Sequence, residues 1–147
     1  MGALVWPLLG VLAGALVATQ APVNAALARG LGAPVAAAAV SFLVGTLALV
    51  VVALIIAPPQ GLHWRAPHIS LFIVGGLLGA CFVTLNIILA PKLGAAALMA
   101  FLVSGQLLAG LVLDRIGFLG LAVREITLGR VAGAAMLLAG ALLIRFT

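Results

Sequence analysis

Residues 34–57 read PVAAAAVSFLVGTLALVVVALIIA and contain no charged side chain. A helix needs about 20 mostly apolar residues to cross the hydrocarbon core of a bilayer, so this stretch is long enough to span a membrane. Outward from it, Arg65 is the only charged residue between Pro34 and Pro91, and further long uncharged runs lie on both sides. The sequence therefore predicts a polytopic membrane protein.

The composition of the chain supports the same class. Of its 147 residues, 67% are hydrophobic and 6% are charged, whereas soluble domains are roughly half apolar and a quarter charged. We expect an all-α integral membrane protein that forms a single domain over residues 1–147. The expected transmembrane spans are 3–28, 34–57, 69–89, 95–113 and 126–144. Residues 116–123 are apolar but too few to cross, so we expect them to lie in the membrane interface.

The few charged and metal-ligating residues argue against several other functions. The net charge is +5, but the seven basic residues are scattered singly or in pairs, which does not favour binding to nucleic acid. The two acids, Asp114 and Glu125, have Arg115 and Arg124 as sequence neighbours, so we expect local ion pairing or a role in topology for them. Arg130, near the start of the last span, is able to snorkel. No metal site, cofactor or enzymatic activity is expected, because no set of ligands or catalytic groups lies within the spans.

Polar side chains within the expected spans are the candidate functional residues, because polar groups inside a membrane are costly. Gln20 and Asn24 are four residues apart and hence on one helix face, with Pro22 between them. A proline leaves one helix carbonyl without its donor, as in the broken helices of transporters, so we expect Pro22 to be a hinge. The alternative is that such side chains only join helices through hydrogen bonds. The expected substrate-binding residues are Gln20, Asn24, Ser41, Asn86, Ser104 and Gln106.

Small residues spaced four apart predict close approach of helices. Packing is the simplest role for them, although they could also ease sliding between helices during transport. The residues are Gly10 with Gly14, Ser41 with Gly45, Gly75 with Gly79, and Gly129 with Gly133.

The basic residues give almost no preference for one orientation in the membrane. With five spans, one side would carry Arg65, Arg115, Arg124 and Arg130, and the other side Arg29, Lys92 and Arg145. Lysine and arginine in short loops set orientation, so four against three is a weak bias. Insertion both ways up would permit an antiparallel homodimer that reproduces an inverted repeat. The alternative is that other features of the loops fix one orientation.

An ordered set of short stretches resembles the YdcZ family, which is EamA-like and belongs to the drug/metabolite transporter superfamily. The stretches are residues 20–27, 41–45, 75–80, 90–94, 105–106 and 114–117, and Arg130 with Gly133. The resemblance implies five helices per chain, half of a ten-helix inverted-repeat transporter, in the bacterial cytoplasmic (inner) membrane. It also implies pairing of two copies in opposite orientations.

These observations lead to two hypotheses. The first is a small-molecule carrier that works as an antiparallel homodimer by alternating access, surrounded by membrane lipids. Its substrate would be a neutral or zwitterionic polar solute, because the spans offer amides and hydroxyls but no buried acid. Small multidrug exporters of the same superfamily, by contrast, use a carboxylate on their first helix. The second hypothesis is a non-transporting membrane subunit or scaffold that pairs with a larger membrane protein.

Overall fold

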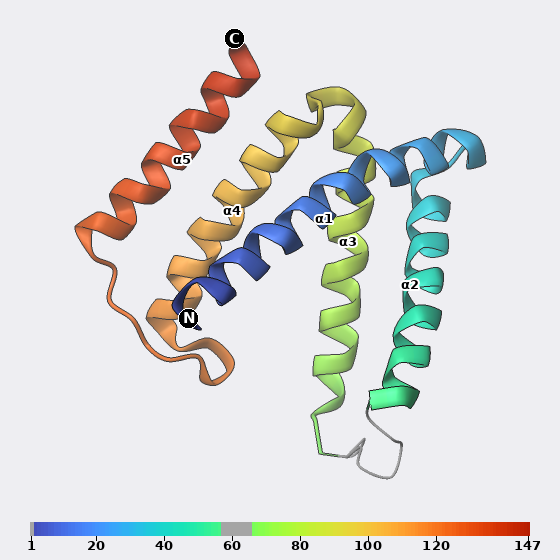
Figure 1. Cartoon of the computed structure of the whole chain (residues 1–147), viewed down its shortest axis with the longest axis horizontal. Coiled ribbons are helices and arrows are strands. Elements are labelled where there is room, and N and C mark those ends of the chain that lie inside the picture. The colour runs from blue at the N-terminus through green and yellow to red at the C-terminus, as the bar shows by residue number, and fades with distance from the viewer. Residues whose placement is uncertain (1, 57–65) are drawn as a thin grey trace. The chain divides into compact units, whose positions relative to one another are not determined.

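Residues 2–56 and 66–147 are described by a computed structural model of the chain (Figure 1). These residues form five α-helices, one short 3-10 helix and no strand. The elements are α1 (Gly2–Leu31), α2 (Pro34–Ile56), α3 (Ile69–Leu93), α4 (Ala95–Ile116), the 3-10 helix η2 (Phe118–Gly120) and α5 (Leu128–Phe146). The expected end of the second span at residue 57, and Arg65 in the following loop, lie outside the described residues.

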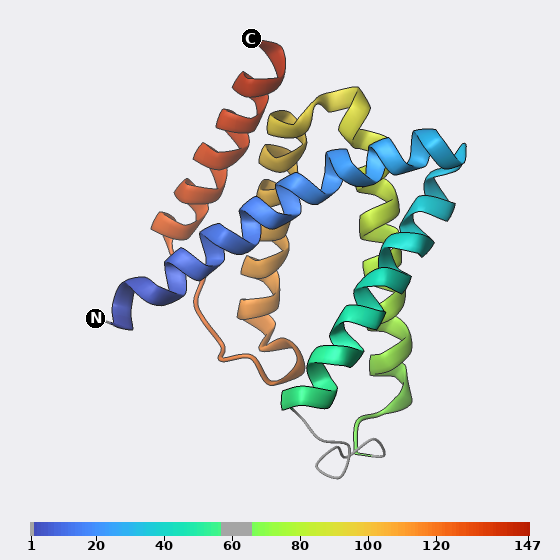
Figure 2. The same ribbon diagram turned by 45° about the vertical axis from the view of Figure 1, so that its right-hand side comes forward.

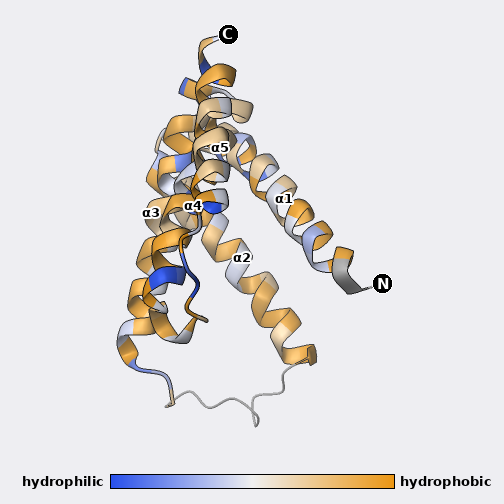
Figure 3. Ribbon diagram, turned by 90° about the vertical axis from the view of Figure 1, so that its left-hand side faces the viewer, coloured by the Kyte–Doolittle hydropathy of each residue, from blue (hydrophilic) through white to orange (hydrophobic). Residues whose placement is uncertain are grey.

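All five helices are long and apolar enough to cross a membrane. Apolar residues predominate along each of them, as the orange colour in Figure 3 shows. In each helix, an apolar stretch of 18 residues is long enough to span a membrane. The described chain itself buries no more than 22% of any of these stretches. A soluble protein does not expose this much apolar surface, so the helices require lipid or a partner around them.

Several helices end at residues other than those expected from sequence. The third span was expected to end at residue 89, but α3 continues through Pro91 to Leu93, and Gly94 then adopts φ 79°. Helix α4 continues to Ile116, where Gly117 ends it in the left-handed conformation. Helix α5 begins at Leu128, because the side chain of Thr127 caps it by accepting a hydrogen bond from the backbone N–H of Arg130.

The helices divide into two compact units, Met1–Pro91 and Lys92–Thr147, and each is described by itself. The first unit contains α1, α2 and nearly all of α3. The second contains α4, η2 and α5. The expectation of a single domain stays a prediction.

The core of the first unit lies where the end of α1, the start of α2 and the second half of α3 meet. Its buried residues are Ala28, Ala37, Ala38, Val83 and Ile87, with Leu27 and Phe82 packed against them. Alanines on α1 and α2 allow these two helices to approach closely. From this junction the N-terminal half of α1 runs away from α2 and α3, as Figures 1 and 2 both show.

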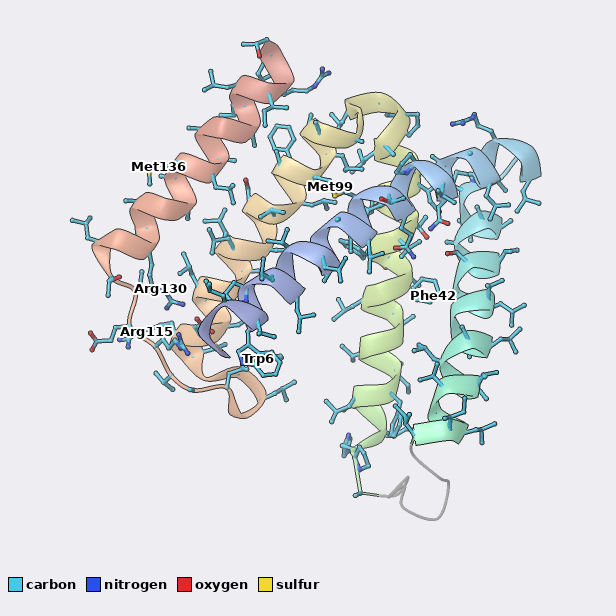
Figure 4. The ribbon with its side chains drawn as sticks, viewed as in Figure 1. Trp6, Phe42, Met99, Arg115, Arg130 and Met136 are labelled. Carbon is cyan, nitrogen blue, oxygen red and sulfur yellow. The ribbon has the colours of Figure 1, made fainter. Side chains whose placement is uncertain are left out.

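One of the expected glycine pairs has a packing partner within the chain. A Cβ atom at Gly79 would lie 3.3 Å from Cζ of Phe42, so the absence of a side chain on α3 makes room for this ring on α2 (Figure 4). By contrast, no described atom of a neighbouring element lies within 4 Å of a Cβ placed at Gly10, Gly14, Gly45, Gly75, Gly129 or Gly133. Their role in helix packing stays a prediction, and within this chain they face open space.

The second unit is an α4–α5 pair whose connection folds back on itself. After Gly117, Leu119 also has a positive φ of 51°, and Gly120 has one of 88°. The chain then runs without regular secondary structure from Leu121 to Thr127. The backbone N–H of Arg124 donates to the carbonyl of Asp114 over 3.0 Å, which ties this connection to the end of α4. The expected position of residues 116–123 in the membrane interface stays a prediction.

Candidate substrate site

The first unit contains a hollow of about 200 Å³ that is lined by all three of its helices. Gln20 of α1 and Val83 of α3 line it together with a face of α2 formed by Ser41, Phe42, Gly45, Thr46 and Leu49. Ser41, Gly45 and Leu49 are four residues apart, and so are Phe42 and Thr46. These two adjacent rows on α2 supply most of the wall. We call this space the Gln20 hollow.

The Gln20 hollow offers hydrogen bonds without charge. Gln20 contributes an amide, and Ser41 and Thr46 contribute hydroxyl groups, while the other lining residues are apolar. An amide and two hydroxyls can donate and accept hydrogen bonds but cannot neutralise an ion. Among the described residues, no charged side chain lines the hollow. The arrangement therefore suits a small uncharged polar group.

Asn24 and Asn86 belong to the same unit but do not line the Gln20 hollow. Each is only 5% exposed. Asn24 lies one helical turn before Ala28, and Asn86 lies between Val83 and Ile87, so both flank the buried core of the unit. Sequence reasoning grouped these two residues with Gln20 and Ser41, and the structure brings only Gln20 and Ser41 into one hollow.

Asn86 carries a buried polar atom without a partner. Its Oδ1 is buried and accepts no hydrogen bond from any described residue. Leaving such an acceptor unpaired costs about 1–3 kcal/mol, and a buried polar group of this kind calls for an explanation. Asn86 is therefore the strongest candidate in the first unit for a group that a ligand would satisfy.

Ser104 and Gln106 lie on α4 and belong to the second unit. Ser104 is buried, and its hydroxyl donates to the carbonyl of Ala100 over 2.8 Å, within its own helix. Gln106 is exposed. The hydroxyl proton of Ser104 is thus already used in the described structure, and a substrate-binding role for either residue stays a prediction.

Pro22 lies within a continuous helix. Helix α1 continues without a break through both Pro7 and Pro22. Because Pro22 has no N–H, the carbonyl of Ala18 lacks the donor that a helix would otherwise give it. The hydroxyl of Thr19, one residue later, donates to the carbonyl of Ala15 over 2.9 Å. Hinge motion at Pro22 stays a prediction.

Thr46 is a hollow-lining residue that the sequence analysis missed. It follows Gly45 directly and lies one helical turn after Phe42, another lining residue. The sequence did indicate Thr46 in one way, because its hydroxyl is the second one, after that of Ser41, in an otherwise apolar helix. Threonine is common in membrane helices, where its hydroxyl can bond to the backbone, and so the signal was weak.

The acids of the second unit do not pair as expected. The carboxylate of Asp114 accepts a hydrogen bond from the guanidinium of Arg130 in a partly exposed salt bridge. Arg130 also donates to the carbonyl of Glu125 over 3.3 Å. Asp114 thus pairs with Arg130 and not with its sequence neighbour Arg115, because the folded-back connection brings the start of α5 to the end of α4 (Figure 4). Snorkelling of Arg130 stays a prediction.

Comparison with known proteins identifies a relationship across nearly the whole chain. The model of the DMT YdcZ family, described as "Putative inner membrane exporter, YdcZ", matches residues 5–143. No significant match was found among curated proteins or among solved structures.

Proposed function

The chain belongs to the YdcZ family of the drug/metabolite transporter superfamily, and from this membership we propose that it is a small-molecule carrier that works as an antiparallel homodimer by alternating access. The family places it in the inner membrane and among exporters rather than enzymes. Within this class we propose a neutral or zwitterionic polar solute as the substrate.

The observation that carries the substrate class is the chemistry of the first unit. The Gln20 hollow is lined by an amide, two hydroxyls and apolar groups, and Asn86 offers an unsatisfied acceptor in the same unit. A cationic substrate would need a carboxylate to offset its desolvation, and both acids of the chain lie in the second unit, where Asp114 is already paired. These groups favour a solute that brings its own hydrogen-bond donors.

The proposal of a homodimer rests on helix surfaces that no other part of the described chain covers. Open space surrounds most of the expected packing glycines, and the N-terminal half of α1 exposes large apolar side chains such as Leu4, Trp6 and Leu8. Five candidate spans are an odd number, so a second copy in the opposite orientation would complete an inverted repeat. The weak Lys/Arg bias permits that insertion.

The same open glycine faces also fit the second hypothesis, a membrane subunit that pairs with a larger partner. The two hypotheses differ in which residues are sensitive. Both hypotheses need faces such as Gly10 with Gly14 for assembly, but only a carrier needs the polar side chains of the Gln20 hollow.

Substitution of the hollow tests the proposed function. Purified full-length protein would be screened for thermal stabilisation by a panel of neutral and zwitterionic solutes, with tetraphenylphosphonium as a cationic comparison. A hit among the neutral and zwitterionic solutes whose stabilising effect is weakened in Gln20→Ala and Ser41→Ala, but unchanged in Thr19→Ala, supports the proposal. Thr19 is a matched control because it neighbours Gln20 without lining the hollow. Stabilisation by the cation alone would contradict the substrate class.

A further inference from the structure

A second hollow in the first unit lies beside a charged residue. It has a volume of about 360 Å³ and is formed around the turn between α1 and α2 and the end of α3. Its lining consists of Ala25, Ala28, Arg29, Gly32, Pro34, Ile87, Ile88 and Pro91. We call this space the Arg29 hollow. It shares no lining residue with the Gln20 hollow.

Arg29 has no countercharge in the described structure. It is the only Lys, Arg, Asp or Glu within residues 2–56 and 66–91. The one ion pair found among the described residues joins Asp114 to Arg130 in the other unit. The first unit therefore supplies no acid of its own among the described residues to balance the exposed Arg29 guanidinium.

The position of Arg29 in the sequence places it at the edge of the bilayer. It lies in the last turn of α1 and follows a run without any charged residue from the start of the chain. The first charge after an apolar span marks the level of the lipid headgroups. Gly32 has φ +72° at the turn, and no described atom of a neighbouring element lies within 4 Å of a Cβ placed there, so the turn leaves this end of the hollow open.

We propose that the Arg29 hollow binds a membrane phospholipid with an anionic headgroup. The planar guanidinium can donate two parallel hydrogen bonds to a phosphate. The remaining walls are mainly aliphatic, and side chains such as Ile88 suit the glycerol and the first carbons of an acyl chain. Basic pockets between transmembrane helices are a recurrent form of anionic-lipid site.

Two features favour an anionic headgroup over a zwitterionic one. The described lining includes no carboxylate that could pair with the ammonium group of a zwitterionic lipid. Pro91 has no N–H, so the carbonyl of Ile87 lacks its usual helical donor and is free to accept a hydrogen bond from a headgroup hydroxyl, a donor that phosphatidylcholine lacks. A phosphatidylglycerol headgroup supplies both a phosphate for Arg29 and hydroxyls.

Lipid titrations of the purified full-length protein in detergent test this site. Native mass spectrometry would count bound phosphatidylglycerol and phosphatidylcholine with identical acyl chains. We expect wild-type protein to retain phosphatidylglycerol preferentially, and Arg29→Gln to lose roughly fivefold in apparent affinity for it, as estimated for one interfacial basic residue. Arg29→Lys keeps the charge without the planar fork and should lose less.

The matched control is Arg145→Gln. Arg145 also lies in the last turn of a helix, α5, but belongs to the second unit and does not line the hollow. Equal phosphatidylglycerol binding by wild type, Arg29→Gln and Arg145→Gln would overturn the proposal. So would competition by inorganic phosphate at the same concentration as the lipid, because it would show a site for free anions. Neither result bears on the carrier proposal, which rests on the Gln20 hollow.

Discussion

At the residue scale, the proposed role of Asn86 in ligand binding makes a prediction about stability. Its Oδ1 is buried without a hydrogen bond from the described residues. Such a group lowers the stability of the protein without ligand. A protein retains an unpaired acceptor of this kind when the acceptor forms a hydrogen bond with a bound ligand. The expected signature is a substitution that stabilises the protein while abolishing ligand binding.

We predict that Asn86→Leu raises the thermal stability of the empty protein. Leucine has the same branched side-chain shape, although it is bulkier, and it removes the unpaired acceptor, which costs about 1–3 kcal/mol. Stabilisation by a polar solute identified in the panel should disappear in the same variant. Thermal unfolding in detergent, with and without the solute, measures both effects. A large loss of stability in Asn86→Leu would show that the amide is satisfied in the folded protein.

We predict that loss of the Gln20 amide weakens ligand binding without unfolding the protein. Gln20 is exposed to the hollow rather than buried in the core, so Gln20→Ala should change the stability of the empty protein by less than about 0.5 kcal/mol. Loss of one hydrogen bond to the ligand should raise its Kd by roughly three- to tenfold. Isothermal titration of wild type, Gln20→Ala and Thr19→Ala measures this, and an unchanged Kd for Gln20→Ala would remove the residue from the site.

At the element scale, the connection between α4 and α5 depends on a few local contacts. Gly117 ends α4 with φ 63°, and a Cβ there would lie 2.8 Å from Cγ2 of Val123. Asp114 then holds both the returning backbone, through Arg124, and the side chain of Arg130. These contacts set the direction in which α5 leaves the connection.

We predict that Gly117→Ala destabilises the protein by about 1–2 kcal/mol, because alanine is strained at this φ and would clash with Val123. Gly110→Ala is the matched control, since Gly110 is helical and has open space around it. Alanine at that position should be neutral or slightly stabilising. Chemical unfolding in mixed micelles compares the two variants, and equal effects would contradict the assignment of Gly117 as a helix-ending residue.

We predict that Asp114 and Arg130 are energetically coupled. Both side chains are partly exposed, 28% and 30%, so the coupling should be no more than about 1 kcal/mol. A double-mutant cycle of Asp114→Asn and Arg130→Gln measures it directly. The same cycle with Arg115→Gln in place of Arg130→Gln should give a coupling near zero. A larger coupling energy for Asp114 with Arg115 than with Arg130 would support the pairing that was expected from the sequence neighbours.

The sequence was most informative where one physical requirement dominates. Uncharged runs such as 34–57 predicted the five candidate spans, because crossing a bilayer requires about 20 apolar residues. Helix ends depend on local backbone details, and so the left-handed Gly117 and the helical Pro91 were not foreseen. The partner of Asp114 was missed for a similar reason, since the folded-back connection brings Arg130 to it from 16 residues away.

The sequence predicted which type of residue would form the candidate site, but not which individual residues would lie together in it. Of the polar residues predicted to bind substrate, Gln20 and Ser41 lie together in one hollow, and their binding role stays a prediction. The sequence could not separate them from Asn24 and Asn86, because helix faces are assigned from spacing while burial depends on how three helices meet. Thr46 was overlooked because a threonine in a membrane helix is often satisfied by its own backbone.

At the scale of the whole molecule, the proposed carrier requires a second copy in the opposite orientation. The family match supports a transporter of the inner membrane, and the single chain leaves most of its apolar helix surface uncovered. The antiparallel homodimer is therefore the central claim. It requires that both orientations coexist in the same membrane.

Cysteine accessibility in intact cells tests this claim most directly. Thr147→Cys and Ala66→Cys would be introduced singly into a Cys81→Ala background and labelled with a membrane-impermeant thiol reagent before and after lysis. With five spans, residue 147 and the loop at residue 66 lie on opposite sides of the membrane in any one orientation. We predict that a substantial fraction of each variant is labelled in intact cells and that the remainder is labelled only after lysis. Labelling of one variant alone would fix a single orientation and contradict the antiparallel homodimer.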